Sequence, residues 1–545
     1  MIKSNYEYWL ESPVFDEATK DELKNLSEAE ITDRFYTKLS FGTSGVRGVL
    51  GAGTNRMNIY LVRRLSHSLG KAILEHDPAA ADRGVVIAYD SRRFSAEFAL
   101  ETALVLGALD IKTYLFDDLR PTPELSFAVR HLGAIAGVNI TASHNPKEYN
   151  GYKVYWEDGA QLPPDHADKI TEILAETDWD VPVLSDGEAL EKGVLNYIGQ
   201  EVDEAYLRCV ADEMLHPEMI AEHGSRLEIV YTPLHGAGAE PVQQILGNLG
   251  FSHVAAVSSQ AMPDGEFPTV SSPNPEESDA WKLALELADE TKADLLLATD
   301  PDADRLGVQC RTADGYYHFT GNQIGLLLTN YILETGNPPE DGVVIHSVVS
   351  TAMTRKITED YGVELRIVPV GFKFIGEQIK QMELSGRGTF LFGFEESIGY
   401  LKGTYARDKD AVLAAALVAE AALYYKVNHG KTLYDVLTEL YEKYGYFEDL
   451  QEPLKFEGIE GQQRIREIIE TLTADTRTEL AGMKIDQRVS EPGLLSIFFE
   501  NCGFIKARPS GTEPKLRVYF CICGNSREDA AAKLQQAKKE LFEII

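Results

Sequence analysis

Three carboxylates, Asp300, Asp302 and Asp304, alternate along one short loop that directly follows an apolar run of residues. Their charges repel one another by several kcal/mol at low dielectric, so a cluster of this kind needs a cation. Hard oxygen ligands at this density are those that Mg²⁺ prefers. A calcium loop of the EF-hand type would continue with glycine and then glutamate where this chain has Arg305 and Thr312. The loop therefore predicts a magnesium site, with a solvated acidic turn as the alternative.

A second candidate loop follows the apolar run at residues 134–142 and carries Ser143 and His144 in a turn made by Asn145 and Pro146. A serine at the end of a predicted strand offers its hydroxyl as a nucleophile. The G-x-S-x-G elbow of serine hydrolases does not surround it. Taken alone, Ser143 indicates either a nucleophile or an ordinary polar turn.

A third loop contains Glu395, Glu396 and Ser397 after Gly-Phe. Alternate side chains of an extended segment project to one side, so Glu395 and Ser397 would face the same way. A carboxylate and a hydroxyl placed like this can hydrogen-bond neighbouring hydroxyl groups of a sugar. The signal is weak without support from the other loops.

The fourth loop combines an arginine with a turn of small residues near the C-terminus. A guanidinium fork, two hydroxyls and backbone N–H groups in one loop suit a phosphate monoester, although a purely structural turn is the alternative. The candidate phosphate-binding residues are Arg508, Ser510, Gly511 and Thr512.

These loops connect short elements that alternate between helix and strand. Apolar residues at 59–75 have helical spacing, the run at 84–90 is strand-like, and the alternation returns over 227–299 and 323–392. This order predicts layered α/β domains with mainly parallel sheets. After residue 459 two strands lie between two helices, which predicts an α+β domain.

The 545 residues are too many for one core, since a domain holds about 100–200 residues. We therefore predict an α/β protein with three similar mixed-sheet α/β domains and a C-terminal α+β domain. Seams are expected near residues 198–203, 318–322 and 446–452. The predicted domains are 1–202 with the serine loop, 203–320 with the metal loop, 321–447 with the sugar loop, and 448–545 with the phosphate loop.

The composition narrows the possible partners. A net charge of −34 argues against nucleic acid and anionic membranes, whereas a local cationic pocket for a small phosphorylated substrate stays compatible with it. We find no run of about 18 apolar residues and no apolar signal core near the N-terminus. The five cysteines are few and scattered, apart from Cys521 and Cys523 in a strand-like run, which fits a reducing cytoplasm. We expect a cytoplasmic protein that acts on small molecules; its oligomeric state is open.

Together the motifs resemble those of the α-D-phosphohexomutase superfamily over nearly the whole chain, and most closely its bacterial phosphoglucomutase/phosphomannomutase members. The resemblance implies four domains around one deep central cleft. The shared motifs are FGTSGVRG at 41–48, TASHNP at 141–146, DPDADR at 300–305, GFEES at 393–397 and RPSGTEP at 508–514.

The resemblance also implies roles for individual residues. In such enzymes the serine that matches Ser143 carries a phosphoryl group at rest, held against one Mg²⁺ by the residues matching Asp300, Asp302 and Asp304. The other implied roles are phosphate binding by Arg508, Ser510, Gly511 and Thr512, sugar contact by Glu395 and Ser397, charge neutralisation by Arg47 and Arg305, proton transfer by Lys153, and substrate contact by Lys373.

The implied reaction interconverts α-D-glucose 1-phosphate and D-glucose 6-phosphate through glucose 1,6-bisphosphate, which serves as intermediate and activator. Phosphoserine donates to the free sugar hydroxyl, the bisphosphate turns over, and Ser143 takes back the other phosphate. The attacking hydroxyl must lose its proton to a base, for which Lys153 is the first candidate and His144 the second. A lysine in this role has to be neutral.

Other functions stay open at this point. Glu396 stands where relatives that accept both glucose and mannose usually have methionine, and phosphopentomutases share the loop style, so a phosphomannomutase or phosphopentomutase is the nearest alternative. A phosphosugar-binding protein without turnover belongs to a different class, and the presence of Ser143, the three aspartates and Arg508 argues against it. A simple phosphatase would not need the loop at Arg508.

Overall fold

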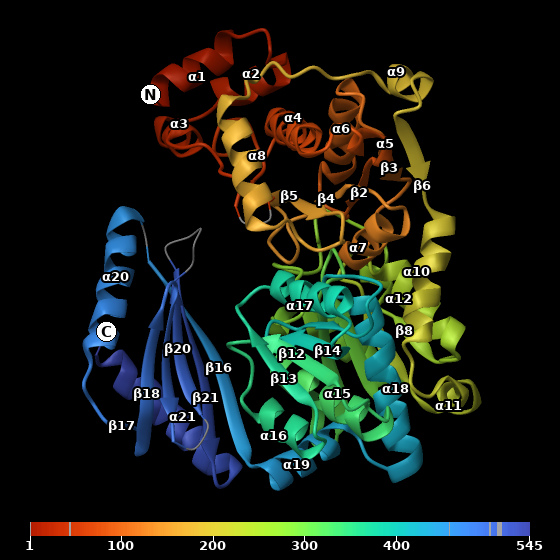
Figure 1. Ribbon diagram of the computed structural model, residues 1–545, viewed down its shortest axis with the longest axis vertical. Helices are drawn as coiled ribbons and strands as arrows, with labels where there is room; N and C mark the ends of the chain where they lie inside the picture. Colours follow the sequence, from red (N-terminus) through yellow and green to blue (C-terminus); the bar gives the residue numbers. More distant parts are fainter. Residues whose placement is uncertain (1, 43–44, 457, 501–502, 510–514, 545) are drawn as a thin grey trace.

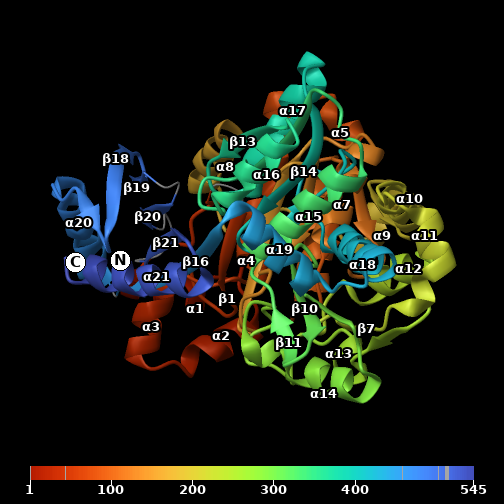
Figure 2. The same cartoon turned by 90° about the horizontal axis from the view of Figure 1, so that it is seen from below.

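Four β-sheets organise the part of the chain that the computed structural model describes, which comprises residues 2–42, 45–456, 458–500, 503–509 and 515–544 (Figure 1). The first three sheets carry helices, and the fourth stands to one side of them in both views (Figures 1 and 2). This is the predicted α/β architecture with a separate C-terminal α+β part.

The first sheet is mixed, with the strand order β1-β5-β4-β2-β3-β6. Alternate side chains of a strand face opposite sides, so Val85 and Ile87 of β2 join a core with α4 and α6, while Val86 and Ala88 join a second core behind the sheet. Both faces are covered, which is why the strand reads as a continuous apolar run. The elements of this part are α1 (Ile2–Glu11), α2 (Glu17–Lys24), α3 (Glu28–Phe35), β1 (Gly45–Val49), α4 (Ile59–His76), α5 (Ala80–Arg83), β2 (Val85–Tyr89), α6 (Ser95–Ala108), β3 (Thr113–Phe116), α7 (Thr122–His131), β4 (Ala136–Ile140), β5 (Tyr149–Trp156), α8 (Pro164–Glu176), α9 (Asp186–Glu191) and β6 (Leu195–Ile198).

The second sheet has the order β11-β10-β9-β7-β8, in which β7, β8 and β9 are parallel and β10 and β11 are antiparallel additions. Strand β9 ends at Thr299, immediately before Asp300, so the sheet places the acidic loop at the carboxyl end of a buried parallel strand. The elements are α10 (Gln200–Asp212), α11 (Pro217–His223), η1 (Gly224–Arg226), β7 (Ile229–Thr232), α12 (Ala239–Leu249), β8 (Val254–Ala256), α13 (Ser258–Ala261), η2 (Ser278–Trp281), α14 (Lys282–Thr291), β9 (Leu295–Thr299), β10 (Leu306–Thr312) and β11 (Gly315–His318).

The third sheet has the order β13-β12-β14-β15, with β15 antiparallel to β14. The chain turns back between Glu395 and Gly399, and Ile398 takes a left-handed conformation (φ 54°) in this turn. The predicted sugar loop is therefore a tight connection between two buried strands. The elements are α15 (Gly321–Thr335), β12 (Gly342–Ser347), α16 (Met353–Asp360), β13 (Glu364–Val368), α17 (Phe372–Ser385), β14 (Thr389–Glu395), β15 (Gly399–Leu401), α18 (Ala411–His429) and α19 (Leu433–Tyr444).

Helix α18 joins the second and third parts of the chain, because it packs against α12 as well as α15. By length and composition it could cross a membrane, but 78% of its most apolar window is buried inside the protein. A helix that is apolar all round and covered by protein is typical of a core.

The fourth sheet, with the order β16-β21-β20-β19-β18-β17, is antiparallel, and α20 and α21 share its core. Ser526 caps the last helix, because its side chain accepts a hydrogen bond from the Asp529 N–H. Residues 446–452, expected as a seam, are the first seven of the ten residues of β16, which pairs with β21 along its length. The domain limits themselves stay predictions. The elements are β16 (Tyr446–Lys455), α20 (Gly458–Ala474), β17 (Glu479–Leu480), β18 (Met483–Glu491), β19 (Leu494–Phe499), β20 (Phe504–Pro509), β21 (Lys515–Gly524) and α21 (Arg527–Phe542).

Candidate active site

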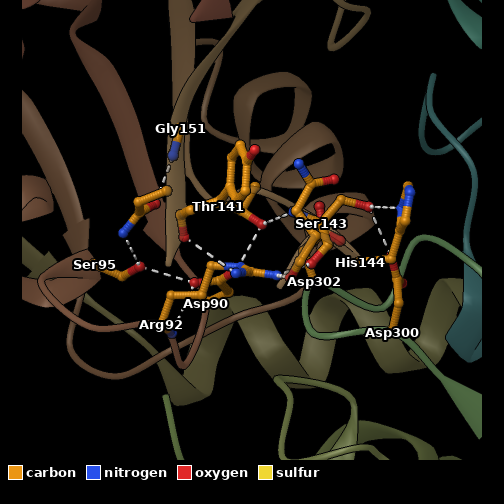
Figure 3. Close-up of polar contacts among 12 residues, drawn as sticks. Asp90, Arg92, Ser95, Thr141, Ser143, His144, Gly151, Asp300 and Asp302 are labelled. Carbon is orange, nitrogen blue, oxygen red and sulfur yellow. Dashed lines mark hydrogen bonds and ion pairs between the residues drawn. The ribbon is translucent and has the colours of Figure 1, made fainter. Parts of the chain in front are cut away.

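The serine loop and the acidic loop meet where β4 and β9 end. Ser143 Oγ donates a hydrogen bond of 2.8 Å to Asp300 Oδ2, although the two residues are 157 positions apart in the chain (Figure 3). Ser143 is only 2% exposed and has a left-handed backbone with φ 54°. Such a conformation is strained for a residue with a side chain, so the surrounding structure must hold it.

Arg92 holds the serine loop through hydrogen bonds to its backbone. The sequence analysis did not identify this residue. Its buried guanidinium donates hydrogen bonds to the backbone carbonyl oxygens of Ser143 (2.6 Å; Figure 3), Pro146 (2.8 Å) and Tyr149 (3.1 Å), and also to that of Asn145. The planar fork of arginine suits this task, because several N–H groups point to fixed places. Four carbonyl groups of one loop therefore depend on one side chain.

Asp90 fixes Arg92 in turn. Its carboxylate lies 3.3 Å from Arg92 Nε and accepts hydrogen bonds from the hydroxyls of Thr141 (2.6 Å) and Ser95 (2.8 Å). Thr141 Oγ1 accepts the backbone N–H of Ser143 at 2.8 Å, which extends the network to the candidate nucleophile. The only hint in the sequence was that Asp-Ser-Arg follows β2, whose neighbour in the sheet is β4.

The three predicted metal ligands lie together and are buried. Ligand oxygens of Asp300, Asp302 and Asp304 are all within 4.8 Å of one another. Asp302 Oδ1 and Asp304 Oδ1 are buried and have no hydrogen-bond partner in the described part of the chain. Burial raises the pKa of Asp300 well above its ordinary value, and the charges of the other two aspartates raise it further. Orphaned carboxylate oxygens at this density fit a bound metal ion.

Two lysines face this triad. Lys153 Nζ lies 2.7 Å from Asp302 Oδ2, and Lys409 Nζ, to which sequence reasoning gave no role, lies 3.1 Å from Asp304 Oδ2. Burial would lower the pKa of Lys153, but Asp302 and Asp304 outweigh it and raise that pKa above the ordinary value. These two contacts favour the charged form of Lys153, whereas a general base requires the neutral form.

His144 and the predicted arginines also surround the serine. His144 Nδ1 lies 3.1 Å from Ser143 Oγ, and burial, with help from Arg305 and Arg47, lowers the pKa of His144 well below its ordinary value. Arg47 Nη1 donates to Asn145 Oδ1 at 3.1 Å. The Arg305 backbone N–H donates to Asp300 Oδ1 at 3.1 Å, and its side chain points to Glu276. A neutral imidazole thus lies among cations beside the hydroxyl.

Glu395 ends β14 as a buried carboxylate. Its Oε1 accepts the backbone N–H of Gly371 at 2.7 Å, and Gly371 has φ 124°, a conformation that favours glycine. Burial raises the pKa of Glu395, and Lys409 opposes that shift. Ser397 is half-buried in the same turn, and Lys373 lies in the first turn of α17 over the ring of Phe374.

The predicted phosphate loop is described only in part. Arg508 lies near the end of β20 and is half-buried. Ser510, Gly511 and Thr512 lie outside the described residues, so their predicted role has no structural account here.

Comparisons with known proteins agree along most of the chain. Models of the phosphoglucomutase/phosphomannomutase alpha/beta/alpha domains I, II and III match residues 38–180, 204–315 and 320–444. A phosphoglucomutase of Staphylococcus epidermidis is 37% identical over 553 residues, which cover 97% of this chain and 98% of the relative.

Two solved structures share the fold. The phosphoglucomutase pp63/parafusin of Paramecium has a TM-score of 0.71 at 18% identity, covering 93% of this chain and 96% of that one. The N-acetylphosphoglucosamine mutase of Aspergillus fumigatus, solved with GlcNAc-6P and magnesium, has a TM-score of 0.50 at 14% identity, covering 98% of this chain and 100% of that one.

Proposed function

Because the chain belongs to the phosphoglucomutase/phosphomannomutase family, we propose that Ser143 relays a phosphoryl group between the two ends of a hexose, interconverting α-D-glucose 1-phosphate and D-glucose 6-phosphate. The observation that carries this proposal is the hydrogen bond from Ser143 Oγ to Asp300 within a buried acidic triad. Phosphoglucomutase activity is supported by 37% identity to a curated phosphoglucomutase over 97% of the chain. The enzyme is then an isomerase that works as an intramolecular phosphotransferase.

Magnesium is the metal that the triad suits best. Asp300, Asp302 and Asp304 would hold one Mg²⁺ beside Ser143, and a bound Mg²⁺ neutralises charge on a transferring phosphoryl group. The two unpartnered oxygens of Asp302 and Asp304 support this assignment, as does the magnesium complex of a neighbour with the same fold.

The remaining chemistry falls to the protein's own side chains. When Ser143 is phosphorylated, the free sugar hydroxyl attacks phosphorus, so that a new O–P bond forms as the bond to Ser143 Oγ breaks. Arg47, Arg305 and Lys153 supply positive charge around the transferred group. His144, which is neutral at pH 7, is placed to accept the proton that the hydroxyl loses.

The second transfer reverses the first with the sugar turned round. Glucose 1,6-bisphosphate presents its other phosphate to Ser143, which takes it back. Arg508 and the loop after it would hold whichever phosphate is not reacting, while Glu395 and Ser397 hold ring hydroxyls. These grips must accept both orientations of the bisphosphate.

Four described cysteines are free thiols, which is typical of a protein in a reducing cytoplasm.

The proposal predicts conversion of glucose 1-phosphate in the presence of Mg²⁺ and trace glucose 1,6-bisphosphate. We expect kcat/KM for glucose 1-phosphate to exceed that for mannose 1-phosphate and ribose 1-phosphate by about tenfold or more. A preference for either of the latter would keep the mechanism and change the sugar. Turnover of none of the three would refute the proposal, as would release of inorganic phosphate at the rate of conversion.

Magnesium binding should also be visible without turnover. A metal that binds only the folded chain stabilises it, by about 2.7 kcal/mol at one hundred times its Kd. We expect Mg²⁺ to raise the melting temperature of chelator-treated wild-type protein and to restore its activity. Asp302→Asn should abolish the Mg²⁺-dependent rise. An equal rise in wild type and variant would place the ion elsewhere.

A further inference from the structure

Lys506 is a buried lysine on β20, two residues before Arg508. It is 4% exposed, and its Nζ lies 4.2 Å from the ring centroid of Phe504 and 5.0 Å from that of Phe498. Burial outweighs the attraction of nearby acidic groups and lowers the pKa of Lys506 to about 8. Burying an ammonium group destabilises the folded protein unless the group is hydrogen-bonded or paired with an opposite charge. An apolar side chain would fill this position without that cost, so we expect the ammonium group to have a role of its own.

The ammonium of Lys506 bonds across two sheets. Its Nζ donates to the backbone oxygen of Val348, which lies just after β12 of the third sheet. Val348 is itself held in place, because its N–H donates to the oxygen of Val368, the last residue of β13, at 2.7 Å. Lys506 thus connects the fourth sheet to the third, at the carboxyl ends of β12 and β13.

Residues 347–352, which include Val348, also bond to the sugar loop. We call residues 347–352 the linking loop. Ser347 Oγ donates to Glu396 Oε2 at 2.9 Å and lies 3.0 Å from Ser350 Oγ. Glu396 stands between Glu395 and Ser397, the two predicted sugar contacts. One side of the linking loop therefore bonds to the sugar loop and the other to Lys506.

The link reaches Arg508 through the geometry of β20. Residues two apart on a strand share a face and are about 6.6 Å apart, so the direction of Lys506 sets that of Arg508. A second contact ties the paired strand to the linking loop, since Ala352 N–H donates to Cys521 Sγ of β21 at 3.4 Å. Two adjacent strands of the fourth sheet thus bond to the loop that holds Glu396.

We infer that Lys506 is a positioning residue, whose bond to Val348 sets the separation between Arg508 and the sugar loop to fit a hexose phosphate. The inference rests on the proposed function, in which Arg508 grips the phosphate that is not reacting. The two grips lie on different sheets, so a hexose phosphate contacts both only when their separation matches the distance between its ring hydroxyls and its phosphate. A lysine suits this place because its long stem reaches the linking loop from between the two rings.

A double-mutant cycle tests this role. Lys506→Met removes the ammonium group and keeps the length of the side chain. We expect KM for glucose 1-phosphate to rise about tenfold and kcat to stay within about threefold of wild type. The reason is that Arg508 binds the substrate equally in the ground state and the transition state. In an Arg508→Met background the same change should alter KM by less than about twofold, since the grip that it positions is gone. Equal factors in both backgrounds would overturn the inference. Lys538→Met, which breaks a 2.7 Å ion pair with Glu452, is the matched control and should leave KM unchanged.

A second measurement reads the contact directly. Lys506→Met should accelerate amide hydrogen exchange in the linking loop several-fold, and Lys538→Met should not. Unchanged exchange and unchanged KM in Lys506→Met, with an active wild type, would overturn this inference alone. A wild type that converts no phosphosugar would refute the proposed function and this role with it.

Discussion

Ser143→Ala is expected to lower the rate of glucose 1-phosphate conversion by about 10⁴-fold or more, since loss of a nucleophile removes the whole covalent route. The hydroxyl lies 2.8 Å from Asp300 Oδ2, so the change deletes the atom through which Ser143 bonds to the acidic triad. The measurement is a coupled assay of glucose 6-phosphate formation with Mg²⁺ and trace bisphosphate. Intact mass should show phosphate on wild-type protein incubated with bisphosphate and none on the variant.

Ser272→Ala provides a matched control for this prediction. Ser272 Oγ donates to the backbone oxygen of His144 at 3.0 Å, so it contacts the same loop without facing the reacting atoms. We expect its rate to stay within about threefold of wild type, since one partly exposed hydrogen bond is worth about 1 kcal/mol. A Ser143→Ala variant that retains activity comparable to the control would exclude the phosphoserine route.

The sequence was most informative about the loops and the strands that precede them. Runs such as the one before Asp300 are apolar throughout because their alternate residues fill two different cores, as Leu295 and Leu296 do on opposite faces of β9. A run of this kind that stops at a polar cluster marks the carboxyl end of a parallel strand, where ligands bind. The meeting of Ser143 with Asp300 could be predicted only through the resemblance to the family, because β4 and β9 belong to different sheets.

The residues that hold the loops in place could not be predicted. Arg92 and Lys409 act across the fold, and apart from the position of Arg92 just after β2 their local sequence resembles that of surface charges. The protonation of Lys153 depends on Asp302, which is distant in sequence and adjacent in space. Long-range contacts decide each of these outcomes.

Arg92→Met is expected to reduce kcat about 100-fold while leaving Ser143 and the metal ligands unchanged. The guanidinium bonds to four carbonyl oxygens of the loop at 143–149 and keeps Ser143 in its left-handed conformation. A displacement of the phosphoserine by about 1 Å would suffice for this loss, because in-line transfer depends on the placement of the reacting atoms. Steady-state kinetics measures the effect, with KM expected to change less than kcat.

Loss of stability has to be separated from loss of placement in this variant. Arg92 and Asp90 have fully buried side chains 3.3 Å apart, so removing the arginine alone leaves an unpaired carboxylate and destabilises the protein by about 3 kcal/mol or more. Asp90→Asn combined with Arg92→Met removes both charges and should recover much of the lost melting temperature. We expect activity to stay low in this double variant, because the four carbonyl groups still lack their donor. If activity returned together with stability, Arg92 would serve folding alone, and the placement of Ser143 would depend on Thr141 and its neighbours.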